Sequence, residues 1–125
     1  MSIHIDDVSV HYSGSEESVL HGISLDIEPG TVTLICGASG SGKSSVLRLI
    51  NGLIPHFHTV EGTGTVTVDG HNVAETEVHQ MGTLTATVFQ NPRTQFFTTD
   101  VDSELAFAGE NYQLPPDTIR ARSAE

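Results

Sequence analysis

The most constraining feature of this sequence is the run Gly37-Ala-Ser-Gly-Ser-Gly42-Lys43-Ser44, which matches the pattern G-x-x-x-x-G-K-S/T. Small residues allow backbone N–H groups to turn inward around an anion, and the positive end of a following helix adds to the attraction. In such a loop the lysine reaches the β- and γ-phosphates and the serine hydroxyl ligates Mg²⁺. The run therefore predicts binding of a nucleoside triphosphate or a related phosphate compound.

The residues on either side of this run predict a strand before it and a helix after it. Residues 31–36 are short, β-branched and apolar, as expected for a strand buried on both faces, with Cys36 packed at its end. Apolar residues recur at helical spacing over 46–53, and Pro55 then ends the element. Lys43 is the only lysine in the chain. A flexible Gly/Ser linker is the alternative interpretation.

Alternating apolar and polar residues predict three further strands around turns. Residues 3–12 and 23–27 are expected to pair antiparallel, with a bulge where two aspartates interrupt the first alternation. The dipeptide Pro29-Gly30 suits a type II turn. Residues 64–68 predict a strand that ends at the hairpin dipeptide Asp69-Gly70, so Asp69 is interpreted as a turn residue rather than a metal ligand.

The second half of the sequence predicts helices around one more strand. A short helix is expected within 73–81, followed by an alternating strand over 84–88. Asp100 is expected to cap a helix that runs to about Tyr112. Pro115 then opens a final helix.

The composition narrows the class of partner. The 125 residues include five Lys plus Arg and sixteen Asp plus Glu, a formal charge of −11. Such an acidic chain is poorly suited to nucleic-acid phosphates or to an anionic lipid surface. No apolar run reaches the roughly 18 residues that span a bilayer, and the N-terminus lacks the features of a signal peptide. We expect at most one domain, with no nucleic-acid partner, no membrane insertion and no intramolecular disulfide.

Three groups of residues resemble the nucleotide-binding subunit of an ATP-binding cassette (ABC) transporter. The first is Val10-His-Tyr12, followed by an acidic loop at 13–18 and by 22–30, which together resemble the antiparallel β-subdomain that precedes the phosphate loop in cassettes. The resemblance implies that Tyr12 stacks on adenine, for which an aromatic face is a suitable platform. Packing of Tyr12 at the end of its strand is the alternative.

The second group, Val88-Phe-Gln90-Asn-Pro92, resembles the Q-loop of cassettes. The resemblance implies that Gln90 reaches Mg²⁺ and the attacking water; a residue that merely ends a strand is the alternative. Catalytic roles would fall to Lys43 and Gln90, and metal ligation to Ser44 and Gln90. The implied nucleotide-binding residues are Tyr12, Gly37, Ala38, Ser39, Gly40, Ser41, Gly42, Lys43, Ser44 and Ser45.

The third group comprises 51–56, 91–97 and 104–111, which resemble the ATPases of energy-coupling factor (ECF) transporters. These take up vitamins and transition-metal ions. The resemblance implies a second ATP-binding subunit and a transmembrane subunit docked near Gln90 to Phe107, on the cytoplasmic face of the membrane. Phe96 and Phe97 are candidates for docking or, equally, for burial inside a helical subdomain.

The expected fold class is an α/β P-loop NTPase of the ABC cassette type with an N-terminal antiparallel β-subdomain. Its parts would be β-subdomain strands (1–30), the P-loop strand and helix (31–54), strands leading to the Q-loop (55–92) and the start of a helical subdomain (93–125). Similar cassettes are roughly twice this length. The signature motif, the Walker B carboxylates and the switch histidine are not found, so we interpret the chain as truncated before them.

The sequence therefore predicts a fragment that binds ATP with Mg²⁺ but hardly hydrolyses it alone, because the general base is missing. Unpaired strand edges would make it marginally stable, self-associating or dependent on a complement. A nucleotide kinase is an alternative, although Arg93, Arg120 and Arg122 are the only arginines after Arg48 for a lid. A non-catalytic binding module is another. Two histidines, His56 and His58, lack a third ligand for a metal.

Overall fold

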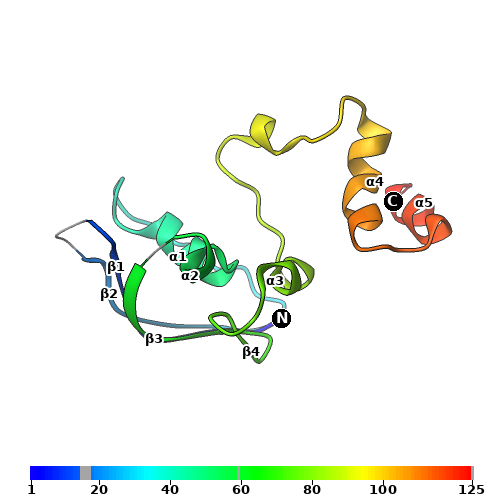
Figure 1. The fold of residues 1–125 in the computed structure, drawn as a ribbon. Coiled ribbons are helices and arrows are strands. Elements are labelled where there is room, and N and C mark those ends of the chain that lie inside the picture. The colour runs from blue at the N-terminus through cyan, green and yellow to red at the C-terminus, as the bar shows by residue number, and fades with distance from the viewer. Residues whose placement is uncertain (15–17, 59, 125) are drawn as a thin grey trace. The chain divides into compact units, whose positions relative to one another are not determined.

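A curved antiparallel sheet organises the first part of the chain. The structure, a computed structural model, describes residues 1–14, 18–58 and 60–124, and the chain divides into two units, Met1–Thr87 and Val88–Glu125. The acidic loop expected at 13–18 thus lies partly outside the described residues. The sheet has the order β2-β1-β3-β4. Its strands are β1 (Ile3–Tyr12), β2 (Ser18–Ile27), β3 (Val60–Val68) and β4 (His71–Asn72) (Figure 1).

The bulge and the turns that the sequence predicts are present in this sheet. At the two aspartates the pairing of β1 shifts register with both of its neighbours, between Ile5 and Val8 against β2 and between Asp6 and Ser9 against β3, and Asp7 has a φ of 45°. Thr31 N donates to Glu28 O at 3.3 Å, and Gly30 has a φ of 75°, as a type II turn requires. Asp69 and Gly70, with φ of 51° and 78°, join β3 to β4. The prediction of Asp69 as a turn residue is confirmed.

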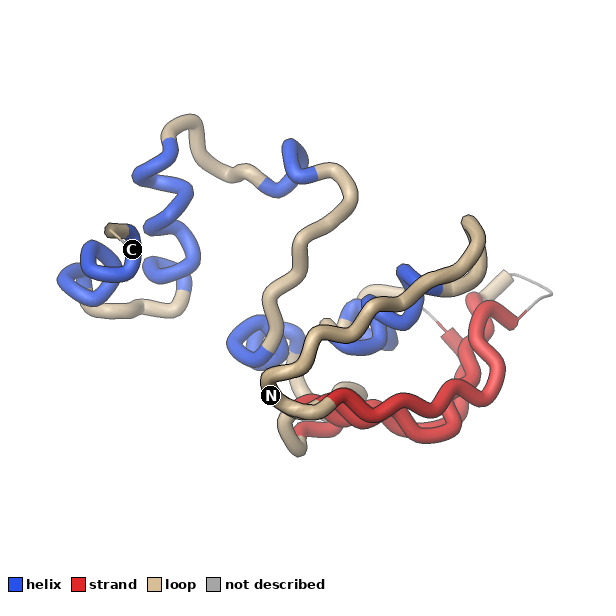
Figure 2. Tube along the Cα trace, turned by 180° about the vertical axis from the view of Figure 1, so that it is seen from behind, coloured by secondary structure: helices blue, strands red, loops and turns tan. Residues whose placement is uncertain are grey.

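Three helices belong to the first unit: α1 (Lys43–Ile50), α2 (Leu53–His56) and α3 (Val78–Leu84). The first two lie on one face of the curved sheet in both views (Figures 1 and 2). The core forms there because the sheet and the helices each bury an apolar face against the other. Its buried side chains are Ile3, Ile5, Val8, Val10, Leu20, Val46, Leu49, Ile54, Val66, Val68, Val73 and Met81.

A helix follows the glycine loop as predicted and begins at Lys43, but not all of the apolar residues at helical spacing over 46–53 are buried. Val46 and Leu49 are buried and Ile50 is half-buried, whereas Leu47 is 52 % exposed. Positions i, i+3 and i+4 lie on one side of a helix, so burial of 46, 49 and 50 turns 47 toward solvent. The helix expected within 73–81 is present as α3, which begins inside that range at Val78 and ends three residues beyond it at Leu84.

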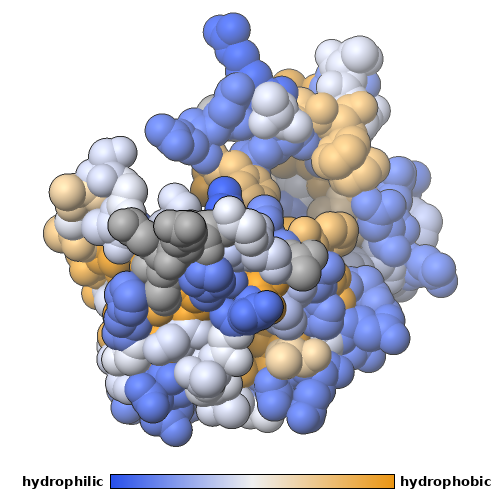
Figure 3. Space-filling view, turned by 60° about the vertical axis from the view of Figure 1, so that its left-hand side comes forward, coloured by the Kyte–Doolittle hydropathy of each residue, from blue (hydrophilic) through white to orange (hydrophobic). Residues whose placement is uncertain are grey.

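Two predicted strands are absent from the described chain. Residues 31–36 form an unpaired loop in which Val32 is 99 % and Leu34 84 % exposed, and Cys36 is exposed rather than packed. Residues 84–88 also form no strand: Leu84 ends α3, the residues after it have no regular secondary structure, and Val88 is 86 % exposed. An apolar, β-branched pattern favours extended backbone but does not supply a partner, and no described strand pairs with either segment. In the space-filling view of Figure 3, exposed hydrophobic residues, coloured orange, lie between hydrophilic residues, coloured blue.

The second unit is helical. It contains the 3₁₀-helix η1 (Pro92–Gln95) and the helices α4 (Val101–Asn111) and α5 (Pro116–Ser123). As predicted, Asp100 caps α4, and its carboxylate accepts from Ser103 N at 2.9 Å. Neither α4 nor α5 has a buried residue. Among the described residues, no helix has the length and apolar character needed to cross a membrane.

Candidate phosphate-binding site

The glycine run 37–42 folds into a tight loop that leads directly into α1. Ser41 N donates to Ala38 O at 3.2 Å, and Gly42 precedes the helix with a φ of 91°. A Cβ at Gly42 would lie 2.7 Å from Leu20 Cδ2 and 3.0 Å from Val19 O, both in β2. Only glycine combines this backbone conformation with this close approach. Strand β2 therefore packs against the loop from one side.

The N-terminus of α1 has backbone N–H groups without partners inside the helix. No side chain caps it and its first turn contains no acidic residue. The first intrahelical bond is donated by Val46 N to Gly42 O at 3.0 Å, so the preceding N–H groups of Lys43, Ser44 and Ser45 have no partner within the helix. A hollow of about 210 Å³ lies here, lined by Val19 and by residues 40–45. Unpaired N–H groups and the helix dipole favour an anion in this hollow.

The Lys43 ammonium group lies inside the loop. Its Nζ donates to Gly37 O at 2.9 Å, to Ala38 O at 2.6 Å and to Ser41 Oγ at 3.3 Å. In the part of the chain that the structure describes, no carboxylate forms an ion pair with Lys43. The loop thus gathers one full positive charge and several N–H donors around a small hollow. A phosphate oxygen would replace the neutral partners of Nζ with a charged one, which makes a stronger hydrogen bond.

The two serines that follow Lys43 lie in different surroundings. Ser44 is exposed and lines the hollow. Ser45 is buried, and its Oγ lies 3.1 Å from Tyr12 Oη. Ser44 can therefore present its hydroxyl to a ligand in the hollow, whereas the Ser45 hydroxyl contacts Tyr12, so Ser45 would contribute mainly its backbone N–H.

Tyr12 lies beside α1 and is half-buried. Besides Ser45, its hydroxyl contacts Arg48 Nη1 at 3.4 Å, and its ring meets that of His58 edge-on, with centroids 5.9 Å apart. The structure thus brings Tyr12 to the helix that begins at the loop. Sequence reasoning missed Arg48 and Val19 at this site, since neither belongs to the glycine run. The contact with Arg48 joins residues far apart in the sequence.

Comparison with known proteins decides the family. Residues 20–123 match the family described as ABC transporter. The chain belongs to the ABC transporter family. It is 48 % identical over 120 residues to a Treponema denticola protein named as an ABC transporter ATP-binding protein, covering 96 % of this chain and 24 % of that protein. A Pyrococcus horikoshii protein of the same description is 43 % identical over 120 residues, which cover 96 % of this chain and 42 % of that protein.

Family membership confirms the broad resemblance to an ABC transporter ATP-binding protein. The assignment of the glycine run to nucleotide binding stays a prediction. The chain spans about a quarter of the Treponema denticola relative. A Saccharolobus solfataricus relative, 39 % identical over 123 residues, is likewise covered over 23 % of its length and 98 % of this chain. The ECF type and the interpretation as a truncated cassette stay predictions.

The segment 88–92, whose sequence resembles a Q-loop, opens the second unit. Gln90 is exposed, and the neighbouring Asn91 caps η1 by accepting from Arg93 N at 3.3 Å. The turn after Gln90 is therefore formed by Asn91 and the proline that follows it. The assignment of Gln90 to Mg²⁺ and to the attacking water stays a prediction.

Two phenylalanines that follow the 88–92 segment are exposed, Phe96 by 63 % and Phe97 by 76 %. Phe97 stacks on Phe107 of α4, with centroids 4.8 Å apart and an interplanar angle of 11°. Glu104 orders the loop between them, because its Oε2 accepts from Phe97 N, Thr98 N and Thr98 Oγ1. These bonds lower the pKa of Glu104, the Thr98 backbone bond most. Exposed aromatic side chains thus follow the 88–92 segment, in a loop that the Glu104 carboxylate holds by hydrogen bonds.

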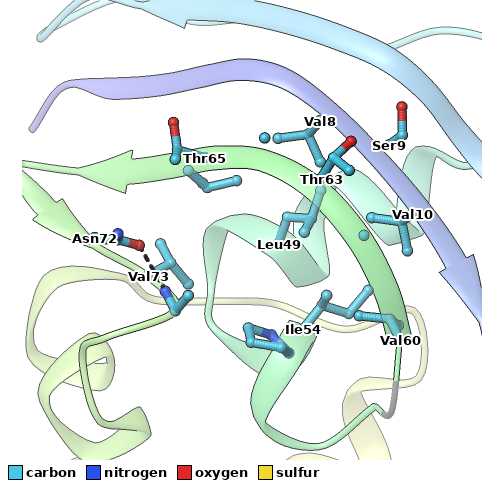
Figure 4. A pocket seen from close by; sticks show the side chains of 15 residues that line it. Val8, Ser9, Val10, Leu49, Ile54, Val60, Thr63, Thr65, Asn72 and Val73 are labelled. Atoms are coloured by element: carbon cyan, nitrogen blue, oxygen red, sulfur yellow. Dashed lines mark hydrogen bonds between the residues drawn. The ribbon is translucent and has the colours of Figure 1, made fainter.

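A second hollow, of about 220 Å³, lies between β3 and the helices of the first unit (Figure 4). Val10, Leu49, Ile54 and Val60 contribute apolar side chains to it, and no charged residue lines it. The Asn72 side-chain oxygen accepts from Ala74 N at 3.1 Å. Because the lining of this second hollow is largely apolar and includes no charged side chain among the described residues, the hollow is unsuited to phosphate.

The histidines do not support a metal site in the described residues, which contain no cluster of three or more metal-ligating side chains. His56 and His58 lie outside the strands of the sheet. His56 ends α2, where its Nε2 lies 3.0 Å from Val73 O, and His58 packs against Tyr12.

Proposed function

We propose that this chain binds ATP with Mg²⁺ through residues 37–45, as the N-terminal part of the ATP-binding subunit of an ECF-type importer. The complete subunit would couple ATP hydrolysis to uptake of a vitamin or a metal ion. The observation that carries the proposal is the uncapped N-terminus of α1 beside the Lys43 ammonium group, around one hollow. Family membership supports ATP as the phosphate compound.

Binding would begin with the triphosphate. The unpaired N–H groups at the start of α1 would donate to phosphate oxygens, and Lys43 Nζ would turn from the carbonyls of Gly37 and Ala38 to the β- and γ-phosphates. Because Lys43 already lies inside the loop, this change needs only a small movement. Its charge would offset the negative charge of the triphosphate.

The donor set fits a Mg²⁺ ion that arrives with the nucleotide. Ser44 presents an exposed hydroxyl in the hollow, and Mg²⁺ usually keeps several waters while it binds few protein ligands and substrate phosphates. The ion would supply charge neutralisation at the β- and γ-phosphates. Gln90 is the second ligand that we propose.

Lys43 and Gln90 would act by positioning and charge stabilisation, without a general base of their own. We therefore propose that hydrolysis needs the complete subunit and a second ATP-binding subunit. The chain of 125 residues is expected to bind ATP with little turnover.

The proposed transmembrane partner would dock near Gln90 to Phe107. Support comes from Phe96 and Phe97, whose exposed rings lie in a segment that Glu104 holds in place. Large exposed apolar side chains beside a polar surface are typical of protein interaction sites. This docking would place the subunit at the cytoplasmic face of the membrane as a peripheral protein.

The Mg²⁺ dependence of ATP binding tests the proposal. In calorimetric titrations with and without EDTA, we expect Mg²⁺ to strengthen ATP binding to the unmodified chain and to have little effect on Ser44→Ala. Ser123→Ala, which removes a serine hydroxyl from α5, is the matched control and should keep the Mg²⁺ effect. An unchanged Mg²⁺ effect in Ser44→Ala would contradict the assigned role.

A further inference from the structure

Two side chains of α1 form hydrogen bonds with the hydroxyl group of Tyr12. Its Oη accepts from Arg48 Nη1 at 3.4 Å and lies 3.1 Å from Ser45 Oγ. Ser45 and Arg48 are three residues apart, so they lie on one side of the helix. A guanidinium group can only donate, which leaves the Tyr12 proton available to Ser45 Oγ. The three side chains thus form a continuous chain of hydrogen bonds.

This chain of bonds links the Tyr12 ring to the phosphate loop through one rigid element. Helix α1 begins at Lys43, and Ser45 lies in its first turn, buried to 5 % exposure. Tyr12 is the last residue of β1, where its ring is held at the hydroxyl by α1 and at its side by His58. Any shift of α1 would therefore carry the ring with it.

We propose that Arg48 is a positioning residue for the nucleobase of the bound nucleotide. It fixes the orientation of the Tyr12 ring on which the base stacks, and it does not touch the ligand itself. This inference rests on the proposed function, since it requires a nucleoside triphosphate in the loop. Arg48 therefore contributes to the affinity for the base of the ligand and not to the affinity for its triphosphate.

A merely structural role for Arg48 makes a different prediction. A basic side chain in the last turn of a helix also stabilises that helix through its dipole. Loss of that effect would weaken α1 as a whole and so reduce the binding of every phosphate ligand alike. A positioning role reduces only the binding of ligands that carry a base.

The experiment compares MgATP with magnesium tripolyphosphate, which has the phosphates but no base, by calorimetric titration into the full chain. We expect Arg48→Met to lower the affinity for MgATP about fivefold, the worth of one hydrogen bond, and to leave that for tripolyphosphate unchanged. Tyr12→Phe, which keeps the ring and removes the hydroxyl, should do the same. Arg48→Lys should recover part of the loss.

Arg120→Met is the matched control, because it removes the same charge from α5 in the second unit. It should leave the affinities for both ligands as they are. Unchanged MgATP affinity in Arg48→Met, or an equal loss for both ligands, would overturn the positioning role while the proposed function stands. If the unmodified chain binds neither ligand, the proposed function fails and this inference fails with it.

Discussion

At Gly42 the glycine loop packs directly against strand β2. Its φ of 91° and the 2.7 Å approach of an added Cβ to Leu20 Cδ2 act at the same position. We expect Gly42→Ala to lower the free energy of unfolding by about 2–4 kcal/mol, from backbone strain and overpacking together. Urea unfolding followed by circular dichroism measures this.

The control for Gly42→Ala is Gly70→Ala. Gly70 has a similar φ of 78°, but an added Cβ there would meet nothing within 4 Å. Its cost should be only about 1–2 kcal/mol, from backbone strain alone. Equal losses in the two variants would show that contact with β2 does not constrain the loop.

At the residue scale, the sequence reveals what is local along the backbone. Gly42 and Lys43 could be assigned because the loop needs a small residue and a cation at fixed spacing, and the structure brings both to one hollow. The contacts of Tyr12 with Ser45 and Arg48 span 33 and 36 residues. No pattern in the sequence marks such a contact, so Arg48 could not be predicted.

At the scale of the elements, two carboxylates stabilise the start of α4 and the loop before it. Asp100 is the N-cap of the helix, and Glu104 lies in its first turn and accepts hydrogen bonds from the loop. The Asp100 carboxylate caps the helix by accepting from the Ser103 N–H, which lowers the pKa of Asp100, and the Thr98 N–H lowers that of Glu104. A carboxyl whose pKa is lower in the folded than in the unfolded state stabilises folding above its unfolded pKa. That contribution is lost as the pH falls through the lowered pKa.

We therefore expect order in the 96–104 segment to fall with acidification below the ordinary carboxyl range. Glu104→Gln should lose much of this order already at neutral pH and show a weaker acid dependence. Amide resonances of Phe97 and Thr98 report it directly, since both N–H groups donate to Glu104. Glu110→Gln, near the other end of α4, controls for loss of one negative charge. Identical acid profiles in all three proteins would contradict the role of Glu104.

Elements with a local signal were predicted well. The β1 bulge, the turn at Pro29-Gly30 and the cap at Asp100 each follow from residues adjacent in the sequence. The strands expected at 31–36 and 84–88 failed because a strand also needs a neighbour. Residue type gives a preference for extended backbone, and pairing is decided elsewhere in the molecule.

For the whole molecule, stability is expected to differ between the two units. The first has a core of buried aliphatic side chains, whereas α4 and α5 have no buried residue. Regions with few buried apolar contacts open at a lower free energy. Native-state hydrogen exchange should therefore show faster exchange in α4 and α5 than in β1 and β3. Equal protection in the two units would contradict this division.

The unpaired segment 31–36 should promote self-association, as expected from the sequence. Val32 and Leu34 are almost fully exposed on an extended chain, which favours edge-to-edge pairing. We expect Leu34→Lys to reduce the concentration-dependent rise in mass measured by sedimentation equilibrium. Thr33→Lys adds the same charge next to it and keeps the apolar side chains, so its effect should be smaller. A monomer at every concentration, with sharp two-state unfolding, would rule out this expectation.

The most direct measurement is a calorimetric titration of MgATP into the full chain and into Lys43→Ala. Lys43 is the only lysine and its Nζ lies inside the loop, so its loss should remove a charge-assisted bond to phosphate. We predict saturable binding to the unmodified chain and an affinity at least about tenfold lower for the variant. Absence of binding to both proteins, or equal binding to both, would contradict nucleotide binding through this loop.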